Sequence, residues 1–515
     1  MKKASEGNTR WRVAQAFLAA LAIAISLWTL FSARSVLSFT EYQVGTTPVT
    51  VVQSMGESGP PVIIAHGFAG SRQFMDSFSL SLARAGLTVV TFDFQGHGRN
   101  PVPMSGDVTQ SNGTTARLVA ETRAVADWAE ARYGGPLSFV GHSMASDVII
   151  RTAETVEAAA IIPLAMYSEA ITPTAPERLL IINGEWEPHL RRAALDALHQ
   201  IDPAAGEGDT VTAGPVIRRA IVAPWVGHVG VLHHPLSLTE ARDWIAAALE
   251  RPLTRPVVST GLPVLILLGG VLLLARPLSF LIPATAPEPF RIDRARFALA
   301  TALPALATPL LVSLVPAGLG PVLAAVPLAA FFTIYGTVQL IVLGTLGLRL
   351  PAPPVLPTLA LILYGVFGFA LAMDMFAASF WPVHGRVWLV LMFLPGALLF
   401  MSADAAVTEA GRDGLGRRVL ARLAIIAAFA GMVAMDVEQL FVLSMMLPVL
   451  VLFFAVFGLM GRWVARRSGA AGAGVGLGVL LAWSFGSALP IFDQNTTGSF
   501  RDLAAVAQPT GNAIP

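Results

Sequence analysis

After residue 256 the sequence is dominated by long apolar runs, and these runs most constrain what the chain can fold into. The chain has 515 residues, of which 54% are hydrophobic and 13% are charged, against roughly 25% charged in an average soluble domain. A run of about 20 apolar residues is long enough to cross the hydrocarbon core of a bilayer as a helix. The sequence therefore predicts an all-α transmembrane bundle in its second half.

We expect eight spans in this half and one more near the N-terminus, about nine in total. The N-terminal run, residues 13–31, follows a group of basic side chains. It is as long as a span requires and lacks a small-x-small cleavage site at its end, so we predict an uncleaved anchor helix. The other predicted spans are residues 257–275, 297–316, 321–347, 355–374, 387–403, 419–436, 440–461 and 472–492.

Arginines in the short loops predict the orientation of these helices, because basic side chains resist translocation. With a cytoplasmic N-terminus, the outer loops 317–320, 375–386 and 437–439 contain only Arg386. We therefore predict a multi-pass protein of the cytoplasmic (inner) membrane, with residues 36–250 and the C-terminal tail outside the cytoplasm. The cytoplasmic loops would hold Arg276, Arg291, Arg294, Arg296, Arg349, Arg412, Arg417, Arg418, Arg462, Arg466 and Arg467.

Residues 36–250 have a different pattern, in which short β-branched runs alternate with amphipathic segments. This pattern is typical of βα units, so we predict a doubly wound, mainly parallel sheet with a leading antiparallel pair in residues 38–53. The expected parts are an anchor (1–35), this α/β domain, an eight-span domain (251–492) and a polar tail (493–515). Predicted strands are 62–66, 88–93, 137–141, 159–164, 178–183 and 218–223, and predicted helices are 72–85, 114–132, 144–156, 189–199 and 237–249.

A serine stands where one predicted strand meets a helix. Strand 137–141 ends in a glycine and is followed by His142, Ser143, Met144 and Ala145. In the Gly-x-Ser-x-Gly nucleophile elbow, a sharp strand-to-helix turn lifts a serine hydroxyl above the sheet, beside N–H groups that can hold an oxyanion. Ala145 replaces the second glycine of that pattern. The motif is therefore incomplete, and other motifs in the sequence are needed to support Ser143 as a nucleophile.

Two more turns follow predicted strands, at the sheet edge where sites in α/β proteins form. One is a His-Gly-Phe turn that ends at Phe68, and the other is the turn 93–98, similar to Asp-x-x-Gly-x-Gly. With these motifs, residues 40–250 resemble the α/β-hydrolase superfamily. The resemblance implies that the backbone N–H groups of Phe68 and Met144 form the oxyanion hole. It also implies that His97 has a structural role.

A serine nucleophile needs a base and a carboxylate that orients the base. The superfamily places this acid after a late strand, usually three residues beyond a glycine, and the matching position is Glu187 after Gly184. Glu185 is the main alternative, and Glu169 after the preceding strand is a weaker one. A solvated loop charge is the non-catalytic interpretation of each carboxylate.

The base is expected after the last strand, where a Gly-His pair precedes a small apolar turn. His228 is the residue that matches. His233 and His234 follow about a helical turn later, where a solvated or helix-start role is expected. Ser143, Glu187 and His228 then occur in the serine, acid, histidine order that the fold requires.

No cap insertion is expected, because only about a dozen residues join predicted strands 159–164 and 178–183. The site is then open to solvent, or covered by the bilayer surface or by outer loops of the bundle. The most substantial outer loop is 375–386, for which an interfacial aromatic belt is the favoured interpretation. Its aromatic and imidazole side chains are Phe376, Phe380, Trp381 and His384.

The remaining composition narrows the function classes. A net charge of +1, without a basic stripe, argues against nucleic-acid binding. With no cysteine, the chain has no disulfide framework, thiolate metal site or cysteine nucleophile, and neither a metal nor a cofactor is expected. The acidic groups of the spans lie at predicted span ends, as water-facing termini or as an outer docking surface, rather than in mid-membrane. They are Asp374, Asp404, Asp436 and Glu438, and the docking-surface alternative applies to the three on the predicted outer side, Asp374, Asp436 and Glu438.

These features together predict a membrane-anchored serine hydrolase that cleaves an ester, thioester or amide through an acyl-enzyme. Ser143 would attack, His228 would relay the proton and Glu187 would orient His228. The expected partners are a small-molecule or lipid acyl substrate and the lipid bilayer. The alternatives are an acyltransferase with the same triad, and a membrane transport or scaffold protein whose hydrolase-like domain is not catalytic.

Overall fold

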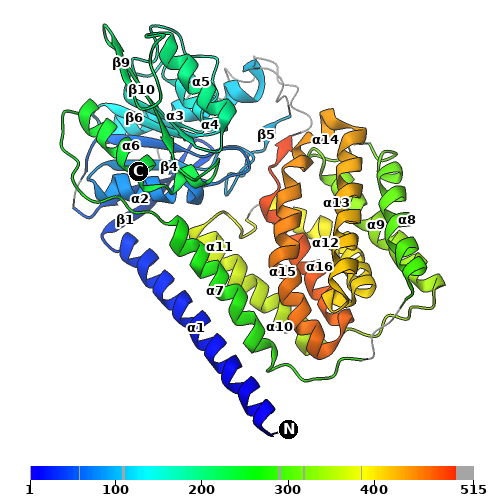
Figure 1. Cartoon of the computed structure of the whole chain (residues 1–515). Helices are drawn as coiled ribbons and strands as arrows, with labels where there is room; N and C mark the ends of the chain where they lie inside the picture. Colours follow the sequence, from blue (N-terminus) through cyan, green and yellow to red (C-terminus); the bar gives the residue numbers. More distant parts are fainter. Residues whose placement is uncertain are drawn as a thin grey trace. The chain divides into compact units, whose positions relative to one another are not determined.

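The computed structural model describes residues 2–56, 58–106, 111–287, 292–316, 319–383 and 385–493. The described chain divides into two compact units, whose elements are labelled in Figure 1. The sheet unit comprises Leu27–Leu265, Phe376–Ser379 and the described residues from Pro490 onward. The helical unit comprises the described residues up to Ser26, with Ile266–Met375 and Phe380–Leu489.

Within the described residues, the sheet unit is built on a nine-stranded sheet in the order β1-β2-β4-β3-β6-β7-β8-β10-β9. The strands from β4 to β10 pair in parallel, whereas β1, β2 and β9 pair antiparallel at the two edges. This confirms the predicted mainly parallel sheet with a leading antiparallel pair. The strands are β1 (Leu37–Val44), β2 (Thr47–Ser54), β3 (Pro61–Ala65), β4 (Thr88–Phe92), β6 (Leu137–His142), β7 (Ala158–Leu164), β8 (Arg178–Gly184), β9 (Thr210–Ala213) and β10 (Val216–Ala223).

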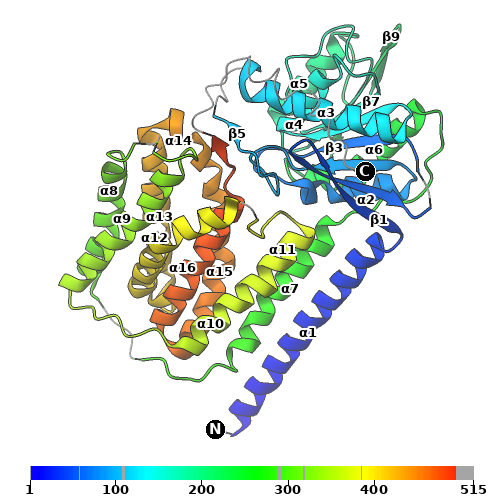
Figure 2. The same cartoon turned by 180° about the vertical axis from the view of Figure 1, so that it is seen from behind.

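Helices cover both faces of this sheet, which is why its central strands are apolar almost throughout. Alternate residues of β3 point to opposite faces, and Val62 and Ile64 pack with Phe78 of α2 and Leu238 of α6 in one buried cluster. Helices α3 and α4 pack together and contact β3, β6 and β7 (Figure 2). The helices are α2 (Asp76–Arg84), α3 (Ala116–Tyr133), α4 (Met144–Thr152), α5 (Pro188–His199) and α6 (Pro235–Ala248).

A second, two-stranded sheet joins distant parts of the chain. Strand β5 (Met104–Ser105) pairs in parallel with β11 (Phe492–Asp493). The sequence analysis predicted neither strand, and its last span, 472–492, extended too far. Helix α16 ends at Ala488, and the described residues after Leu489, Pro490–Asp493, belong to the sheet unit.

Nine helical segments of the described residues are long and apolar enough to cross a membrane, which agrees with the predicted count. They begin with Arg10–Arg34 of α1 (Lys2–Arg34), and the segment Val355–Phe376 contains a π-helical turn, Tyr364–Ala370, between α10 and α11. The other elements are α7 (Gly261–Ser279), α8 (Arg294–Val312), α9 (Ala325–Thr345), α10 (Val355–Leu363), α11 (Leu371–Phe376), α12 (Gly385–Thr408), α13 (Leu415–Met435), α14 (Val437–Ser444), α15 (Met446–Ser468) and α16 (Ala470–Ala488).

Two carboxylates expected at water-facing span ends are buried instead. Helix α12 continues to Thr408, so Asp404 lies inside it, is 2% exposed and forms an ion pair with Arg422 of α13. Asp374 is also buried, and its Oδ1 accepts hydrogen bonds from the backbone N–H groups of Phe380 (3.0 Å) and Trp381 (2.9 Å). Asp436 lies half-buried at the C-terminus of α13, and the side chain of Glu438 lies outside the described residues.

The predicted aromatic belt in residues 375–386 is also corrected. Phe376 is 3% exposed and packs edge-on against Phe31 at 5.5 Å, and both residues belong to the sheet unit. Phe380 is 8% exposed, and its carbonyl oxygen accepts the indole N–H of Trp483 at 2.8 Å. His384 lies outside the described residues.

Candidate active site

Ser143 occupies a strained turn between β6 and α4. Its backbone angles are φ 53° and ψ −117°, in a sparsely populated region that costs a residue with a side chain about 1–3 kcal/mol. The turn is held by hydrogen bonds from the Ser143 N–H to the Leu164 carbonyl and from the Ser146 N–H to the Ser143 carbonyl, both 2.8 Å long. The side-chain hydroxyl of Ser146 donates to the same Ser143 carbonyl at 2.5 Å. Hydrogen bonds to the sheet and to the first turn of α4 thus hold Ser143 in this strained conformation.

Small residues on either side permit this turn. A Cβ atom on Gly141 would lie 2.6 Å from the carbonyl oxygen of Ala145, so a side chain at position 141 would force the strand and the helix apart. Ala145 itself is fully buried, and the elbow accommodates its methyl group where the usual motif has glycine. The departure from Gly-x-Ser-x-Gly therefore leaves the geometry of the turn intact.

The three residues predicted as a triad form one hydrogen-bonded line. His228 Nε2 lies 2.8 Å from Ser143 Oγ, and His228 Nδ1 lies 2.6 Å from Glu187 Oε1. An ionised carboxylate can only accept, so Nδ1 carries the proton and Nε2 is left to accept the serine hydroxyl. This is the tautomer that a general base for Ser143 requires.

Glu187 is fixed by the start of α5. Its carboxylate is largely buried, and its second oxygen, Oε2, accepts the Gly184 N–H at 2.7 Å. It is the N-cap residue of α5, where Pro188 begins the helix and the positive end of the helix dipole stabilises a negative charge. A Cβ on Gly184 would lie 2.6 Å from the Val226 carbonyl oxygen, so glycine lets the loops that carry Glu187 and His228 approach.

The other two candidate acids have different partners. Glu185 Oε2 accepts the backbone N–H of Trp225 at 2.6 Å and so holds the loop before His228. Glu169 accepts the hydroxyl of Tyr167 at 3.0 Å on the exposed surface. The structure therefore places Glu187, and neither alternative, against the imidazole of His228.

The turn that carries Phe68 lies against the serine. A Cβ on Gly67 would stand 3.0 Å from Ser143 Cβ and 2.8 Å from His142 Nδ1. Met144 is the first residue of α4, so its N–H is one of the helix-terminal donors that lack an acceptor within the helix. The predicted oxyanion donors, the amides of Phe68 and Met144, thus border Ser143 from two directions.

Two histidines beside Ser143 are buried and held neutral. Burial, with the nearby His228 as a smaller cause, lowers the pKa of His142 to about 3, and its Nε2–H donates to the His228 carbonyl at 2.8 Å. Burial also lowers the pKa of His66, whose Nε2 accepts the Phe94 N–H at 3.1 Å. The role of His142 in holding the loop that carries His228 was not predicted from the sequence, although this residue directly precedes Ser143.

The remaining predicted histidines have structural partners. His97 is buried, its Nδ1 lies 2.9 Å from the Gln95 carbonyl, and its ring packs on Phe68. His234 caps α6 by accepting the Leu236 N–H at 3.2 Å, as a helix-start role predicts. His233 is not solvated but partly buried, with Nδ1 2.8 Å from Ser77 Oγ.

Three large aromatic side chains of the sheet unit are exposed, and two of them, Trp186 and Trp225, lie close in sequence to Glu187 and His228. Trp225 is 77% exposed, Trp186 is 65% exposed and Tyr167 is 60% exposed. Trp225 also has a positive φ of 59°, so the chain adopts a strained conformation at a residue whose indole faces water.

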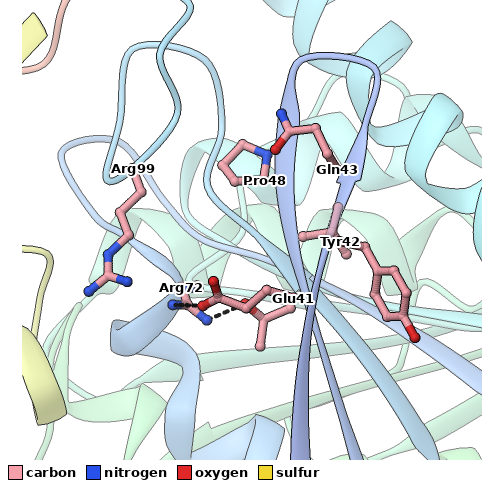
Figure 3. Close-up of a pocket in the computed structure, with 8 residues that line it drawn as sticks. Glu41, Tyr42, Gln43, Pro48, Arg72 and Arg99 are labelled. Carbon is pink, nitrogen blue, oxygen red and sulfur yellow. Dashed lines mark hydrogen bonds and ion pairs between the residues drawn. The ribbon is translucent and has the colours of Figure 1, made fainter. Parts of the chain in front are cut away.

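A separate cavity of about 300 Å³ lies at the antiparallel edge of the sheet (Figure 3). Glu41 and Arg72 lie together in it, where the Arg72 guanidinium donates to Glu41 at 3.2 Å and also to the hydroxyl of Thr50. None of the three aligned residues lines this cavity. Among the described residues, no group of three or more His, Asp or Glu side chains is arranged to hold a metal ion.

Comparison with known proteins identifies this architecture. Residues 57–192 match the family described as serine aminopeptidase, S33, and the matched region includes Ser143 and Glu187. The sheet unit is an α/β-hydrolase domain. This hydrolase domain lacks a cap helix, since the described segment 165–177 between β7 and β8 contains no helix.

Two uncharacterized proteins of Mycobacterium tuberculosis, from strains CDC 1551 / Oshkosh and ATCC 25618 / H37Rv, are similar to the chain. Each is 26% identical over 191 residues, which are 34% of this chain. The chain spans 64% of the length of these curated relatives.

Solved structures similar to the hydrolase domain include TT1662 from Thermus thermophilus, with 19% identity, a TM-score of 0.32 and coverage of 42% of this chain and 99% of that chain. XC6422 from Xanthomonas campestris, described as a serine hydrolase without lid, has 20% identity, a TM-score of 0.30 and coverage of 42% and 96%. A bacterial membrane phospholipase A has 14% identity, a TM-score of 0.32 and coverage of 48% and 99%.

Proposed function

We propose that the protein is a serine hydrolase that cleaves an ester, thioester or amide through an acyl-enzyme. The observation that supports this most is the continuous line of hydrogen bonds from Ser143 Oγ through His228 to Glu187. The line starts at a serine in the strained conformation of a nucleophile elbow. Because Glu187 can only accept, His228 presents its basic nitrogen to the hydroxyl.

The reaction follows from these positions. Ser143 Oγ attacks the substrate carbonyl carbon while His228 Nε2 takes the hydroxyl proton, and the tetrahedral oxyanion accepts hydrogen bonds from the Phe68 and Met144 amides. His228 then gives the proton to the leaving alcohol, thiol or amine as its bond to the carbonyl carbon breaks. A water molecule, deprotonated by His228, attacks the acyl-enzyme, and Ser143 recovers its proton as the acid leaves.

The two buried histidines, His142 and His66, do not interfere with this proton transfer. Burial disfavours the charged forms of both, so the pKa of His142 is lowered to about 3 and the pKa of His66 is lowered as well. They therefore place no positive charge beside His228 that would oppose formation of its imidazolium. His142 also donates to the His228 carbonyl, which fixes the backbone of the base.

A lipid or other amphiphilic acyl compound is the substrate class that we propose, with the bilayer as the partner surface. The exposed indoles of Trp186 and Trp225 support this, since such side chains favour a site that is apolar on one side and wet on the other. The nine candidate spans of the described residues would keep the enzyme at its substrate. If a lipid or glycan hydroxyl replaced water in the second step, the same residues would transfer the acyl group.

The hydrolase domain is proposed to lie outside the cytoplasm, in keeping with the arginine distribution. The chain contains no cysteine, so single cysteines report sidedness without a background. With an impermeant maleimide on intact cells, we expect the exposed Glu154→Cys position to be labelled and Arg349→Cys to react only after lysis. The reverse pattern would contradict this orientation.

The catalytic proposal is tested with a fluorophosphonate probe on the purified full chain. We expect one labelled serine, loss of labelling in Ser143→Ala, and a fall in ester hydrolysis of about 10⁴-fold or more. Ser38→Ala is the matched control, because Ser38 donates only to a strand carbonyl, that of Gln53. Equal labelling of wild type and Ser143→Ala would reject the proposal and favour a non-catalytic scaffold.

A further inference from the structure

The hydrolase domain includes a short segment from the far end of the chain. Residues Pro490–Asp493, which we call the strap, belong to the sheet unit and directly follow the helical unit in sequence. The N–H of Ile491 donates to the Gly96 carbonyl at 2.9 Å, and the N–H of Met104 donates to the Ile491 carbonyl at 2.8 Å. Phe492 is fully buried and pairs with Met104 between β11 and β5, the latter labelled in Figure 2.

Glycines in the loop after β4 make this approach possible. A Cβ on Gly96 would lie 2.6 Å from the Ile491 carbonyl oxygen, and Gly96 has a positive φ of 75°. A Cβ on Gly106 would lie 3.0 Å from the Asp493 carbonyl oxygen. Glycine thus stands at two positions where a side chain would press against a carbonyl oxygen of the strap, so the strap packs closely against the rest of the domain.

The strap contacts the proposed oxyanion loop through one ring. The ring of Phe492 lies 5.8 Å from that of Phe68, at an interplanar angle of 40°. Phe68 also packs against His97, with ring centroids 5.3 Å apart. Phe68 is followed by Ala69 at a positive φ of 55°, so the loop is locally strained and needs such support.

The opposite end of the same loop is held by Phe376–Ser379, which also belongs to the sheet unit. The backbone N–H of Ser379 donates to Ser71 Oγ at 3.0 Å, and the Gln73 amide donates to Ser379 Oγ at 3.2 Å. Segments that follow two different apolar helices therefore contact both ends of the loop that carries Phe68.

We propose that the strap positions the oxyanion loop, and that Phe492 is the positioning residue that acts on Phe68. The inference rests on the proposed serine hydrolase function. An oxyanion donor works because it is pre-organised toward the charge that develops, so a loosened Phe68 amide lowers the rate of chemistry more than substrate binding. The strap follows every candidate span of the described residues, so the proposed site needs the chain to be made at least as far as the strap.

The test uses the full chain and two positions of termination. A protein that ends after Asp493 keeps the strap and is the matched control for one that ends after Leu489. On a short-chain p-nitrophenyl ester, we expect the control to retain activity. Removal of the strap, or Phe492→Ala, should lower kcat roughly 10- to 100-fold with little change in KM, less than the loss on removing an oxyanion donor outright. Phe492→Tyr, which keeps the ring, should restore most of kcat.

Active-site titration separates positioning from folding. Fluorophosphonate labelling counts the sites that are folded, and kcat is then expressed for each labelled site. A loss only in the number of sites, with kcat for each site unchanged, would overturn the positioning role of Phe492. The same conclusion would follow if Phe492→Ala kept its full activity.

A double-mutant cycle with Phe68→Ala tests the path of the effect. If Phe492 acts through the Phe68 ring, the double variant should lose about as much kcat as one single variant, because the two changes break one contact. Losses that multiply would reject this path. If the unchanged protein shows no labelling that depends on Ser143, the proposed function itself fails, and the two failures are thereby distinguished.

Discussion

The hydrolase domain and the helical unit differ in how their ionisable side chains are arranged. In the hydrolase domain, Glu187 and His228 converge on one serine, and the side chain of His228 is 47% exposed toward a substrate. In the helical unit, Asp404 is paired with Arg422, and the buried Arg386 donates to the Ser487 and Leu489 carbonyls at 2.9 and 2.8 Å. The ionisable side chains of the hydrolase domain are thus directed at Ser143, whereas those named in the helical unit are paired with other protein groups.

The difference follows from the solvent that each region is expected to meet. Water is absent from a bilayer core, so each polar group there must be satisfied by protein, and a charge left over is costly. A domain in water can leave a serine and an imidazole available, and it can also hold backbone strain at Ser143. We therefore propose that the hydrolase domain carries out the chemistry and that Asp404 and Arg422 stabilise the helical unit.

The largest expected effect distinguishes two neighbouring carboxylates of the hydrolase domain. Glu187→Gln should lower kcat by about 10⁴-fold, because an amide no longer selects the His228 tautomer or stabilises its imidazolium. Glu185→Gln should cause a much smaller loss, since the Glu185 carboxylate accepts the Trp225 N–H rather than the imidazole of His228. Steady-state hydrolysis of a soluble ester measures both variants. A larger loss of kcat in Glu185→Gln than in Glu187→Gln would identify Glu185 as the acid instead.

The next effect concerns the buried ion pair of the helical unit. Asp404→Asn leaves Arg422 without its partner and should destabilise the protein by about 3 kcal/mol or more. Thermal unfolding in detergent measures this loss, and kcat for each labelled site should remain unchanged. The double variant Asp404→Leu/Arg422→Met removes both charges and should recover stability. Loss of catalysis without loss of stability in Asp404→Asn would give the helical unit a chemical role.

The smallest effect is a dependence of stability on pH at His142. Folding lowers its pKa from 6.5 to about 3, so between these values the unfolded chain binds a proton that the folded chain excludes. Wild-type stability should therefore fall as the pH drops below 6.5, by at most about 1.4 kcal/mol per pH unit from this group.

Comparison with His142→Asn isolates that contribution. The stability advantage of the wild type over this variant should shrink between pH 7.5 and pH 5.5, as measured by denaturant unfolding. The exposed His189→Gln is the control, and its difference from wild type should stay nearly constant. A constant difference for His142→Asn as well would show that His142 is not held neutral by burial.

Much of the fold was predictable because local patterns carry it. The apolar length of each span, the alternation of β-branched and amphipathic runs and the turn after Gly141 depend on residues close together in sequence. The order of Ser143, Glu187 and His228 follows from the order of the strands. The structure differs from the prediction at Asp404. This residue lies near the end of an apolar run, and nothing in the sequence around it indicates that Arg422 is its partner.

The sequence by itself determined the membrane-type helices, the mainly parallel sheet and the position of the serine elbow, because hydropathy and turn chemistry act over a few residues. Only the tertiary structure decided that Glu187 rather than Glu185 meets His228, since the two carboxylates lie two positions apart and differ in direction. It alone brought Phe492 to Phe68. A contact across more than four hundred positions leaves no periodicity in the sequence, because it is set by how whole elements pack.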